Sequence, residues 1–237
     1  MNAIFAKIRF IWSAIVIFVI VSFLMIPLVF VFRKHKGIIM HKLNRVIMFL
    51  LGSKPIQVGT MDLNADMYLL NHQGIIDIIA MEALQTNHLR WIAKKELFSI
   101  PYIGQLLHLG DMISVDRESK KSILKLLSDV KYSINTLNRK VAIFPEGTRS
   151  KSQKLLNFKS GAKIIAEKLE LKVQPVVVTG SRMLVDEAKK LSHKSDVVFN
   201  FLPTIDIKTS REDWYEEIQK QMQKVIDDEL KFNNRSR

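Results

Sequence analysis

Hydrophobic and polar positions divide the 237-residue chain into two parts with different patterns. The first part contains an uninterrupted apolar run from Phe10 to Phe32, which is 23 residues long and carries no charge. At ~1.5 Å per residue, a straight helix of this length spans about 34 Å, slightly more than the ~30 Å hydrocarbon core of a bilayer. Residues 38–51 then combine apolar positions with Lys42 and Arg45, which predicts a basic amphipathic helix suited to a membrane interface.

The apolar run is compatible with two arrangements in a membrane. One is a single spanning helix, favoured by the basic residues that follow the run, Arg33, Lys34 and Lys36. The other is a buried hairpin that enters and leaves one leaflet, with a kink expected at Pro27. A helix pair packed on the protein's own core is disfavoured because the run is uniformly apolar. A signal peptide is disfavoured because its apolar region is usually shorter and ends at small residues.

A break at Gly52 to Pro55 separates this part from the rest, and we place the domain boundary there. Residues 1–52 are expected to form membrane-anchoring helices, and residues 53–237 an α/β domain. In this second part, short apolar runs alternate with stretches of helical periodicity, which indicates a layered fold of sheet and helices. Strands are predicted at 56–58, 67–71, 90–93, 112–115, 141–144, 173–178 and 197–201, and helices at 118–137, 161–169 and 211–230, with a loop at 206–210.

The charge distribution points to the same membrane contact. The net charge is +13, and eight Lys and Arg but no Asp or Glu precede Asp62, so most of the excess lies around the apolar N-terminus. An anionic lipid surface attracts juxtamembrane basic residues by roughly 1 kcal/mol each, whereas a nucleic-acid interface places them on a polar face with stacking aromatics. We therefore expect membrane lipids as partners and no nucleic acid. The absence of cysteine excludes disulfides, thiolate metal sites and a protein-bound thioester.

A histidine and an aspartate lie five residues apart after the predicted strand 67–71, at a strand end of the kind where open α/β sheets carry their chemistry. If a turn brings Asp77 back to His72, the carboxylate can hold one ring nitrogen and leave the other as a general base of fixed tautomer. Gly74 is expected to allow a sharp turn between them. The alternative is a helix-capping aspartate beside an incidental histidine.

A second polar motif follows the predicted strand 141–144 and reads Pro145-Glu146-Gly147-Thr148-Arg149-Ser150. Gly147 allows the backbone to approach a ligand closely, and the planar guanidinium of Arg149 matches phosphate oxygens. Glu146 could accept a hydrogen bond from a glycerol or sugar hydroxyl, or could hold Arg149 in place. The alternative is an ordinary Pro-Gly turn with surface charges.

Three further residues stand at or within predicted strands. Arg117 follows the strand 112–115 and is either a second phosphate clamp or the partner of a neighbouring acid. Lys94 directly follows the strand 90–93. Pro175 lies inside the apolar run 173–178, where a proline indicates an edge strand or a bulge.

These pieces occur between residues 67 and 181 in the order His-x4-Asp, Lys-Lys-Glu-Leu-Phe, Asp-Arg, Phe-Pro-Glu-Gly-Thr-Arg-Ser and Pro-Val-Val-Val. Their order and spacing resemble the glycerolipid acyltransferase superfamily, and within it the bacterial 1-acyl-sn-glycerol-3-phosphate (lysophosphatidic acid) acyltransferases. The resemblance implies an O-acyltransferase that moves a fatty acyl group from an acyl thioester, acyl-CoA or acyl-ACP, to the free sn-2 hydroxyl of lysophosphatidic acid. The product is phosphatidic acid in phospholipid biosynthesis. The resemblance implies neither a cofactor nor a metal.

The resemblance also assigns roles to the residues that match the family motifs. His72 is the general base, and Asp77 orients it and stabilises its positive charge. The acyl pocket includes Pro175 and Val176. The residues assigned to binding of the glycerol phosphate are Glu146, Gly147, Thr148 and Arg149, with Arg117 assisting and Lys94 near the phosphate.

Departures from the family pattern concern the acceptor more than the reaction. Gly74 stands where serine is frequent, Asp111 fills a glycine position, and Ser114 stands where Phe or Pro is usual. The acceptor therefore stays open between lysophosphatidic acid, glycerol-3-phosphate and another lysophospholipid, and a non-catalytic membrane-surface protein is a further alternative. A serine hydrolase is disfavoured because no Gly-x-Ser-x-Gly motif is present, and a metal site because the other histidines show no ligand spacing around His72.

The acyl donors also bear on where the protein acts. Acyl carrier protein is acidic and coenzyme A carries phosphates, so both suit a basic protein face. Both are cytosolic, and we therefore expect a bacterial inner (cytoplasmic) membrane protein whose catalytic domain faces the cytosol.

Overall fold

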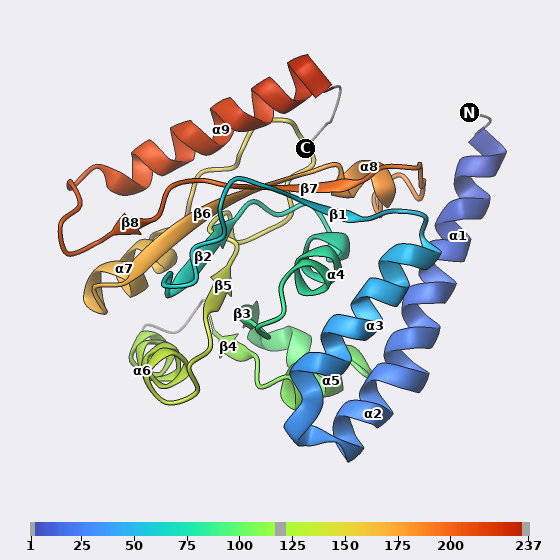
Figure 1. The fold of residues 1–237 in the computed structure, drawn as a ribbon, viewed down its shortest axis with the longest axis horizontal. Helices are drawn as coiled ribbons and strands as arrows, with labels where there is room; N and C mark the ends of the chain where they lie inside the picture. The colour runs from blue at the N-terminus through green and yellow to red at the C-terminus, as the bar shows by residue number, and fades with distance from the viewer. Residues whose placement is uncertain (1–2, 117–121, 234–237) are drawn as a thin grey trace.

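The computed structural model describes residues 3–116 and 122–233, and within them eight strands form one mixed sheet (Figure 1). The strands are β1 (Pro55–Val58), β2 (Met67–Leu70), β3 (Arg90–Lys94), β4 (Ile113–Val115), β5 (Val141–Ile143), β6 (Lys172–Thr179), β7 (Val197–Phe201) and β8 (Ile205–Asp206). The α-helices are α1 (Ala3–Val19), α2 (Ile26–Val31), α3 (Lys36–Leu50), α4 (Ile75–Leu84), α5 (Ile103–Leu109), α6 (Ser122–Asn135), α7 (Ser160–Lys168), α8 (Ser181–Leu184) and α9 (Trp214–Asn233). A π-helical turn, Ile20–Met25, joins α1 to α2, and 3₁₀ turns cover Arg33–His35 and Lys95–Ser99.

The strand order across the sheet is β1-β7-β6-β2-β5-β3-β4, and β8 pairs with β6. β2 pairs in parallel with β5 and β6, and β3 pairs in parallel with β5 and β4. β7 and β8 pair with β6 in the antiparallel direction, and β1 pairs in parallel with β7, so these three strands run opposite to the other five. Consequently the carboxyl ends of β2 to β6 lie along one edge of the sheet, which is the edge where open α/β sheets bind ligands.

The central strand β2 is buried on both faces of the sheet. Met67 and Leu69 belong to the apolar cluster that includes residues of α6, α7 and α9, whereas Tyr68 and Leu70 belong to the cluster that includes α3 and α4. This alternation is the two-residue period of a strand. Figure 1 shows α9 on one side of the sheet and α4 with α3 on the other. Burial on both sides explains why the strand reads as a continuous apolar run.

The N-terminal helices present an apolar surface that the rest of the chain leaves uncovered. Residues Ala3–Val31 form one helical segment, which is long and apolar enough to cross a membrane by length and composition. Its most apolar 18-residue stretch is only 22% buried within the protein. Large side chains such as Ile8, Phe23 and Phe30 are more than half exposed. Exposed apolar area of this extent is typical of a surface that contacts lipid, so the segment indicates membrane association.

The helix α3 attaches this apolar segment to the sheet. Met40 and Ile47 of α3 are buried in the same cluster as Val29 of α2 and residues of α4. At the start of α3, Lys36 forms an ion pair with Asp111, which lies just before β4. The apolar cluster therefore continues across residue 52, while the division of the chain into two domains at that residue stays a prediction.

The predicted strands are present, with ends within one residue of the prediction. Three of the strands and α-helices were missed: α5 and α8, which are too short to show a clear helical period, and the two-residue strand β8. The prediction of a loop starting at Asp206 is wrong at that residue, because Asp206 pairs with Lys172 of β6. The predicted helix at 118–137 begins at Ser122 within the described residues.

Pro175 lies in the middle of the sheet, so the expectation of an edge strand is wrong. The register supports a bulge instead. Val176 pairs with Phe201 and Val173 pairs with Ile205, so two residues of β6 lie opposite three residues between β7 and β8. At this step Leu202 donates its N–H to the Pro175 carbonyl. The carbonyl of Leu202 accepts a hydrogen bond from the side-chain amide of Gln174 at 3.0 Å. That amide replaces the N–H that a proline lacks.

Candidate active site

The two polar motifs meet at the carboxyl edge of the sheet because β2 and β5 are parallel neighbours. His72 lies two residues beyond the end of β2, and the motif that starts at Phe144 directly follows β5. The N–H of Ser150 donates to the His72 carbonyl at 2.9 Å, and the N–H of His72 donates to Glu146 Oε1 at 3.0 Å. The structure therefore joins the two motifs through backbone donors.

Asp77 lies in the first turn of α4 and holds the ring of His72. His72 Nδ1 and Asp77 Oδ2 are 2.9 Å apart. The same oxygen accepts the N–H groups of Gln73 at 2.6 Å and Gly74 at 3.0 Å. The side chain of Asp77 is fully buried, whereas 14% of the His72 side chain is exposed. The aspartate thus caps α4 and holds the histidine ring at the same time, so the capping position does not exclude the pair, while its catalytic role stays a prediction.

Burial opposes the ionisation of Asp77, but the surrounding donors outweigh it. Burial raises the pKa of this carboxyl, whereas the hydrogen bond and charge of His72 and the N–H of Gln73 lower it, and the net pKa lies below the usual value. An ionised carboxylate only accepts hydrogen bonds, so His72 donates from Nδ1. The Nε2 atom then carries the lone pair, which makes it the atom of the pair that can accept a proton.

Gly74 leaves space for a neighbouring side chain and is not needed for a turn. Its φ of −174° is extended backbone that any residue adopts, so the expectation of a glycine-specific turn is wrong. A Cβ atom at this position would lie 2.8 Å from Glu187 Oε1. The missing side chain therefore leaves room for the carboxylate of Glu187.

An aromatic stack supports one face of the His72 ring. The ring centroids of His72 and Phe144 are 3.8 Å apart, and their planes differ by 13°. Phe144 stacks in turn on Trp91 at 5.2 Å, and Trp91 Nε1 donates to the buried carboxylate of Glu82 at 2.8 Å. The stack restricts rotation of the imidazole and offers a π face to its protonated form. Sequence reasoning missed this role of Phe144, because the stack depends on the pairing of β2 with β5.

Glu146 is fully buried and connects the two motifs through backbone donors. Its Oε1 accepts the N–H of His72, and its Oε2 accepts the N–H of Leu156 at 2.8 Å. The acid that pairs with Arg149 is Glu187, so the suggestion that Glu146 holds Arg149 in place is wrong. The direct contact of Glu146 with a glycerol hydroxyl stays a prediction.

Arg149 lies at the surface beside the histidine motif. Its side chain is 47% exposed, and its Nη1 is 2.5 Å from Oε2 of Glu187 in the segment after α8. Thr148 is exposed as well, and Gly147 has a φ of +70°, a left-handed conformation that favours glycine. Sequence reasoning also missed Glu187, which lies 38 residues beyond Arg149 and belongs to no motif.

The remaining predicted residues lie apart from this cluster or outside the described residues. Lys94 ends β3, one strand beyond β5, and pairs with Glu96 at 3.1 Å. Pro175 and Val176 are buried in β6, the other neighbour of β2. Arg117 lies outside the described residues. Their roles in phosphate and acyl binding stay predictions.

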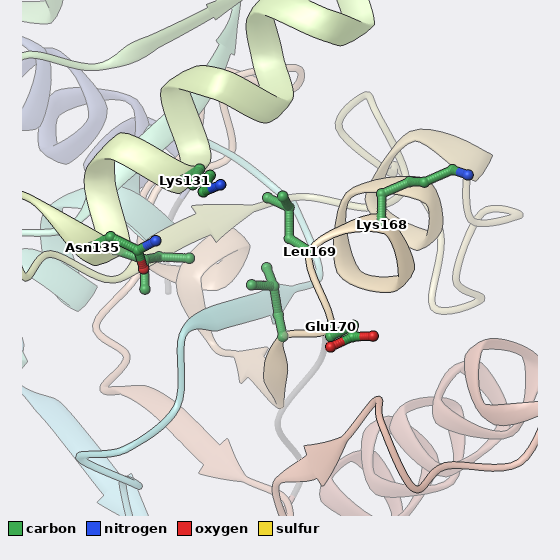
Figure 2. Close-up of a pocket in the computed structure, with 7 residues that line it drawn as sticks. Lys131, Asn135, Lys168, Leu169 and Glu170 are labelled. Atoms are coloured by element: carbon green, nitrogen blue, oxygen red, sulfur yellow. The ribbon is translucent and has the colours of Figure 1, made fainter.

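A surface hollow elsewhere in the molecule is drawn in Figure 2. It is lined by Lys131 and Asn135 of α6 and by Lys168, Leu169 and Glu170 at the end of α7. These residues precede β5 and β6, whereas the two motifs follow β2 and β5, so the hollow is separate from the site. No group of three or more His, Cys, Asp or Glu in the described residues is arranged to hold a metal ion.

Comparison with known proteins places the chain among the acyltransferases. The Acyltransferase family model matches residues 64–179, which contain both motifs. A 1-acyl-sn-glycerol-3-phosphate acyltransferase of Helicobacter pylori is 43% identical over 169 residues, covering 71% of each chain. A protein of the same name from Cocos nucifera is 33% identical over 60% of this chain and 47% of its own length. The crystal structure of a 1-acyl-sn-glycerophosphate (LPA) acyltransferase from Thermotoga maritima has a TM-score of 0.80, 21% identity and 98% coverage of both chains.

The fold and the site thus define an α/β acyltransferase that carries an apolar N-terminal helix. The chain belongs to the acyltransferase family, which confirms the resemblance and the prediction of an enzyme. The layered fold behind an N-terminal helical segment is confirmed by the Thermotoga maritima structure.

Replacing Asp77 tests the lowered pKa through the pH dependence of stability. The folded-state pKa lies below the unfolded value of about 3.9, so ionised Asp77 contributes stability that is complete above that value and lost as pH falls through the folded pKa. The difference in unfolding free energy between wild type and Asp77→Asn should therefore be constant near pH 5 and shrink below about pH 4. Urea titrations between pH 2 and 5 measure it, and a constant difference over that range would contradict the assignment.

Replacing Glu146 by glutamine separates a supporting role from direct contact with substrate. The amide keeps one acceptor but turns an NH₂ group toward a backbone donor, which should lower the unfolding free energy by about 1–3 kcal/mol. Acyl transfer should fall together with stability because the His72 N–H loses its anchor. Denaturant unfolding and steady-state kinetics measure the two effects. Unchanged stability with a raised KM would indicate direct contact between Glu146 and the substrate instead.

Proposed function

We propose that this protein transfers a fatty acyl group from an acyl thioester to the sn-2 hydroxyl of 1-acyl-glycerol-3-phosphate, giving phosphatidic acid in phospholipid biosynthesis. The observation that carries the proposal is the hydrogen-bonded pair of His72 and Asp77, joined directly to the motif that contains Arg149. The names and identities of the relatives from Helicobacter pylori and Cocos nucifera support this acceptor.

The geometry of the pair supports a general-base mechanism without a protein nucleophile. Nε2 of His72 takes the proton of the acceptor hydroxyl while the hydroxyl oxygen attacks the thioester carbonyl. Collapse of the tetrahedral intermediate breaks the carbon–sulfur bond, and the imidazolium returns its proton to the leaving thiolate. Asp77 stabilises the imidazolium in between, because its buried carboxylate is ionised and already bonded to Nδ1.

Positioning of the acceptor falls to the exposed motif beside the histidine. The guanidinium of Arg149 can donate two parallel hydrogen bonds to a phosphate, and Thr148 and the backbone at Gly147 lie next to it. Arg117 and Lys94 are proposed to add positive charge, and Pro175 and Val176 to contribute to the acyl pocket. Holding the hydroxyl against the thioester supplies much of the rate, since proximity alone can be worth several orders of magnitude.

The apolar segment Ala3–Val31 is proposed to bring the catalytic domain to its lipid acceptor. Basic residues follow that segment at Arg33, Lys34 and Lys36, which favours the cytosolic side of a bacterial inner membrane. Acyl-CoA and acyl carrier protein are both present on that side. We therefore place the acyl-donor encounter in the cytosol and the product in the membrane.

Removing the imidazole tests the proposed base. His72→Ala should lower the rate of acyl transfer by a factor of roughly 10²–10⁴, the usual contribution of general acid–base catalysis, while membrane association stays intact. The assay uses purified protein, labelled acyl-CoA and lysophosphatidic acid, with glycerol-3-phosphate and other lysophospholipids as competing acceptors. His35→Ala, which removes an exposed histidine between α2 and α3, is the matched control and should retain activity. Full activity in His72→Ala would overturn the mechanism.

Replacing Arg149 by lysine tests the phosphate contact. Lysine keeps the positive charge but loses the planar fork, so the KM for lysophosphatidic acid should rise on the order of tenfold with little change in kcat. The same exchange at Arg211, which is exposed and pairs with Asp213, should leave both constants unchanged. A lower kcat at unchanged KM would mean that Arg149 acts in the transition state rather than in acceptor binding.

A further inference from the structure

The carboxylate of Glu187 has two partners, one at each polar motif. Its Oε2 is 2.5 Å from Nη1 of Arg149. Its Oε1 accepts the backbone N–H of Ile75 at the start of α4 at 2.9 Å. Glu187 itself lies in the bend that follows β6 and α8, outside the region matched by the family model. One side chain thus ties the arginine to the helix that carries Asp77.

The absence of a side chain at Gly74 leaves room for this contact. Gly74 lies beneath the carboxylate, and any Cβ there would approach Oε1 to 2.8 Å although the backbone does not require glycine. The ion pair is also open to solvent, with 47% of the Arg149 side chain and 37% of the Glu187 side chain exposed. Exposed pairs are weak, so the two side chains can separate at little cost.

We propose that the carboxylate of Glu187 competes with the acceptor's phosphate for the guanidinium of Arg149. Glu187 pairs with Arg149 when no phosphate is bound, and the pair separates when the phosphate binds. The proposal rests on the proposed function, in which Arg149 binds that phosphate. A phosphomonoester carries up to two negative charges and three acceptor oxygens, so it is the stronger partner for a guanidinium fork. The carboxylate nevertheless reduces the apparent affinity for every ligand that needs Arg149, because Arg149 must first be released.

The same competition acts on the product. Phosphatidic acid keeps the phosphate of its precursor, so the competition for Arg149 weakens the binding of substrate and product alike. Return of the Glu187 carboxylate to Arg149 would then assist departure of the product. Glu187 touches no reacting atom in this scheme, and its effect should appear in binding constants rather than in the chemical step.

Glu187→Gln tests the proposal because the amide has the same shape without the charge. The KM for lysophosphatidic acid and the Ki of inorganic phosphate should both fall by about two- to fivefold, the range expected for an exposed ion pair. The kcat should not rise. The matched control is Glu216→Gln, which removes an exposed carboxylate of α9 from its ion pair with Lys163 of α7 and should change neither constant. Unchanged or raised constants in Glu187→Gln would overturn the competition, and a raised KM would make Glu187 a support for Arg149.

A double variant shows whether the effect of Glu187→Gln on phosphate binding depends on Arg149. In Arg149→Ala protein, adding Glu187→Gln should have no further effect on the binding of inorganic phosphate, measured by titration calorimetry. A residual effect of similar size would assign Glu187 a role independent of Arg149 and overturn the proposal. Because calorimetry needs no turnover, tighter phosphate binding by Glu187→Gln would support the competition even if the wild type failed to acylate lysophosphatidic acid, a result that would reject only the proposed function.

Discussion

The site depends on the parallel pairing of β2 with β5 in the centre of the sheet. This pairing places the ends of two strands, about seventy residues apart in sequence, on neighbouring positions of one edge. The histidine motif leaves one strand and the arginine motif leaves the other, and they bond to each other through Ser150 and Glu146. The apolar residues that bury β2 on both faces are therefore a precondition of the chemistry, although none of them takes part in it.

Two buried carboxylates convert that proximity into a defined geometry. Glu146 accepts backbone N–H groups from the histidine motif and from Leu156, and Asp77 accepts one ring N–H and two backbone N–H groups. Buried charge is costly unless donors surround it, so each carboxylate stabilises only the arrangement that supplies all its partners. The ring of His72 is thereby held by Asp77 at its edge and by Phe144 on its face.

The polarity of the site changes over a short distance. Asp77 and Glu146 are out of contact with solvent, His72 is slightly exposed, and Arg149 with Glu187 lies at the surface. Such a gradient suits the proposed mechanism, in which the base is oriented rigidly while the acceptor enters and leaves with a charged group. The apolar segment Ala3–Val31 adds the third requirement, since a lipid acceptor must be met at a membrane surface.

The sequence by itself determined the apolar segment, the order of strands along the chain and the motifs at their ends, because these follow from local hydrophobic period and residue chemistry. Only the tertiary structure decided which strands are neighbours. It placed Pro175 in a central strand, paired Arg149 with Glu187 rather than Glu146, and set Phe144 against the ring of His72. The space beside Gly74 is likewise taken by a residue more than a hundred positions away. Each of these contacts joins segments distant in the chain, and no local pattern encodes a partner that only the packed sheet brings near.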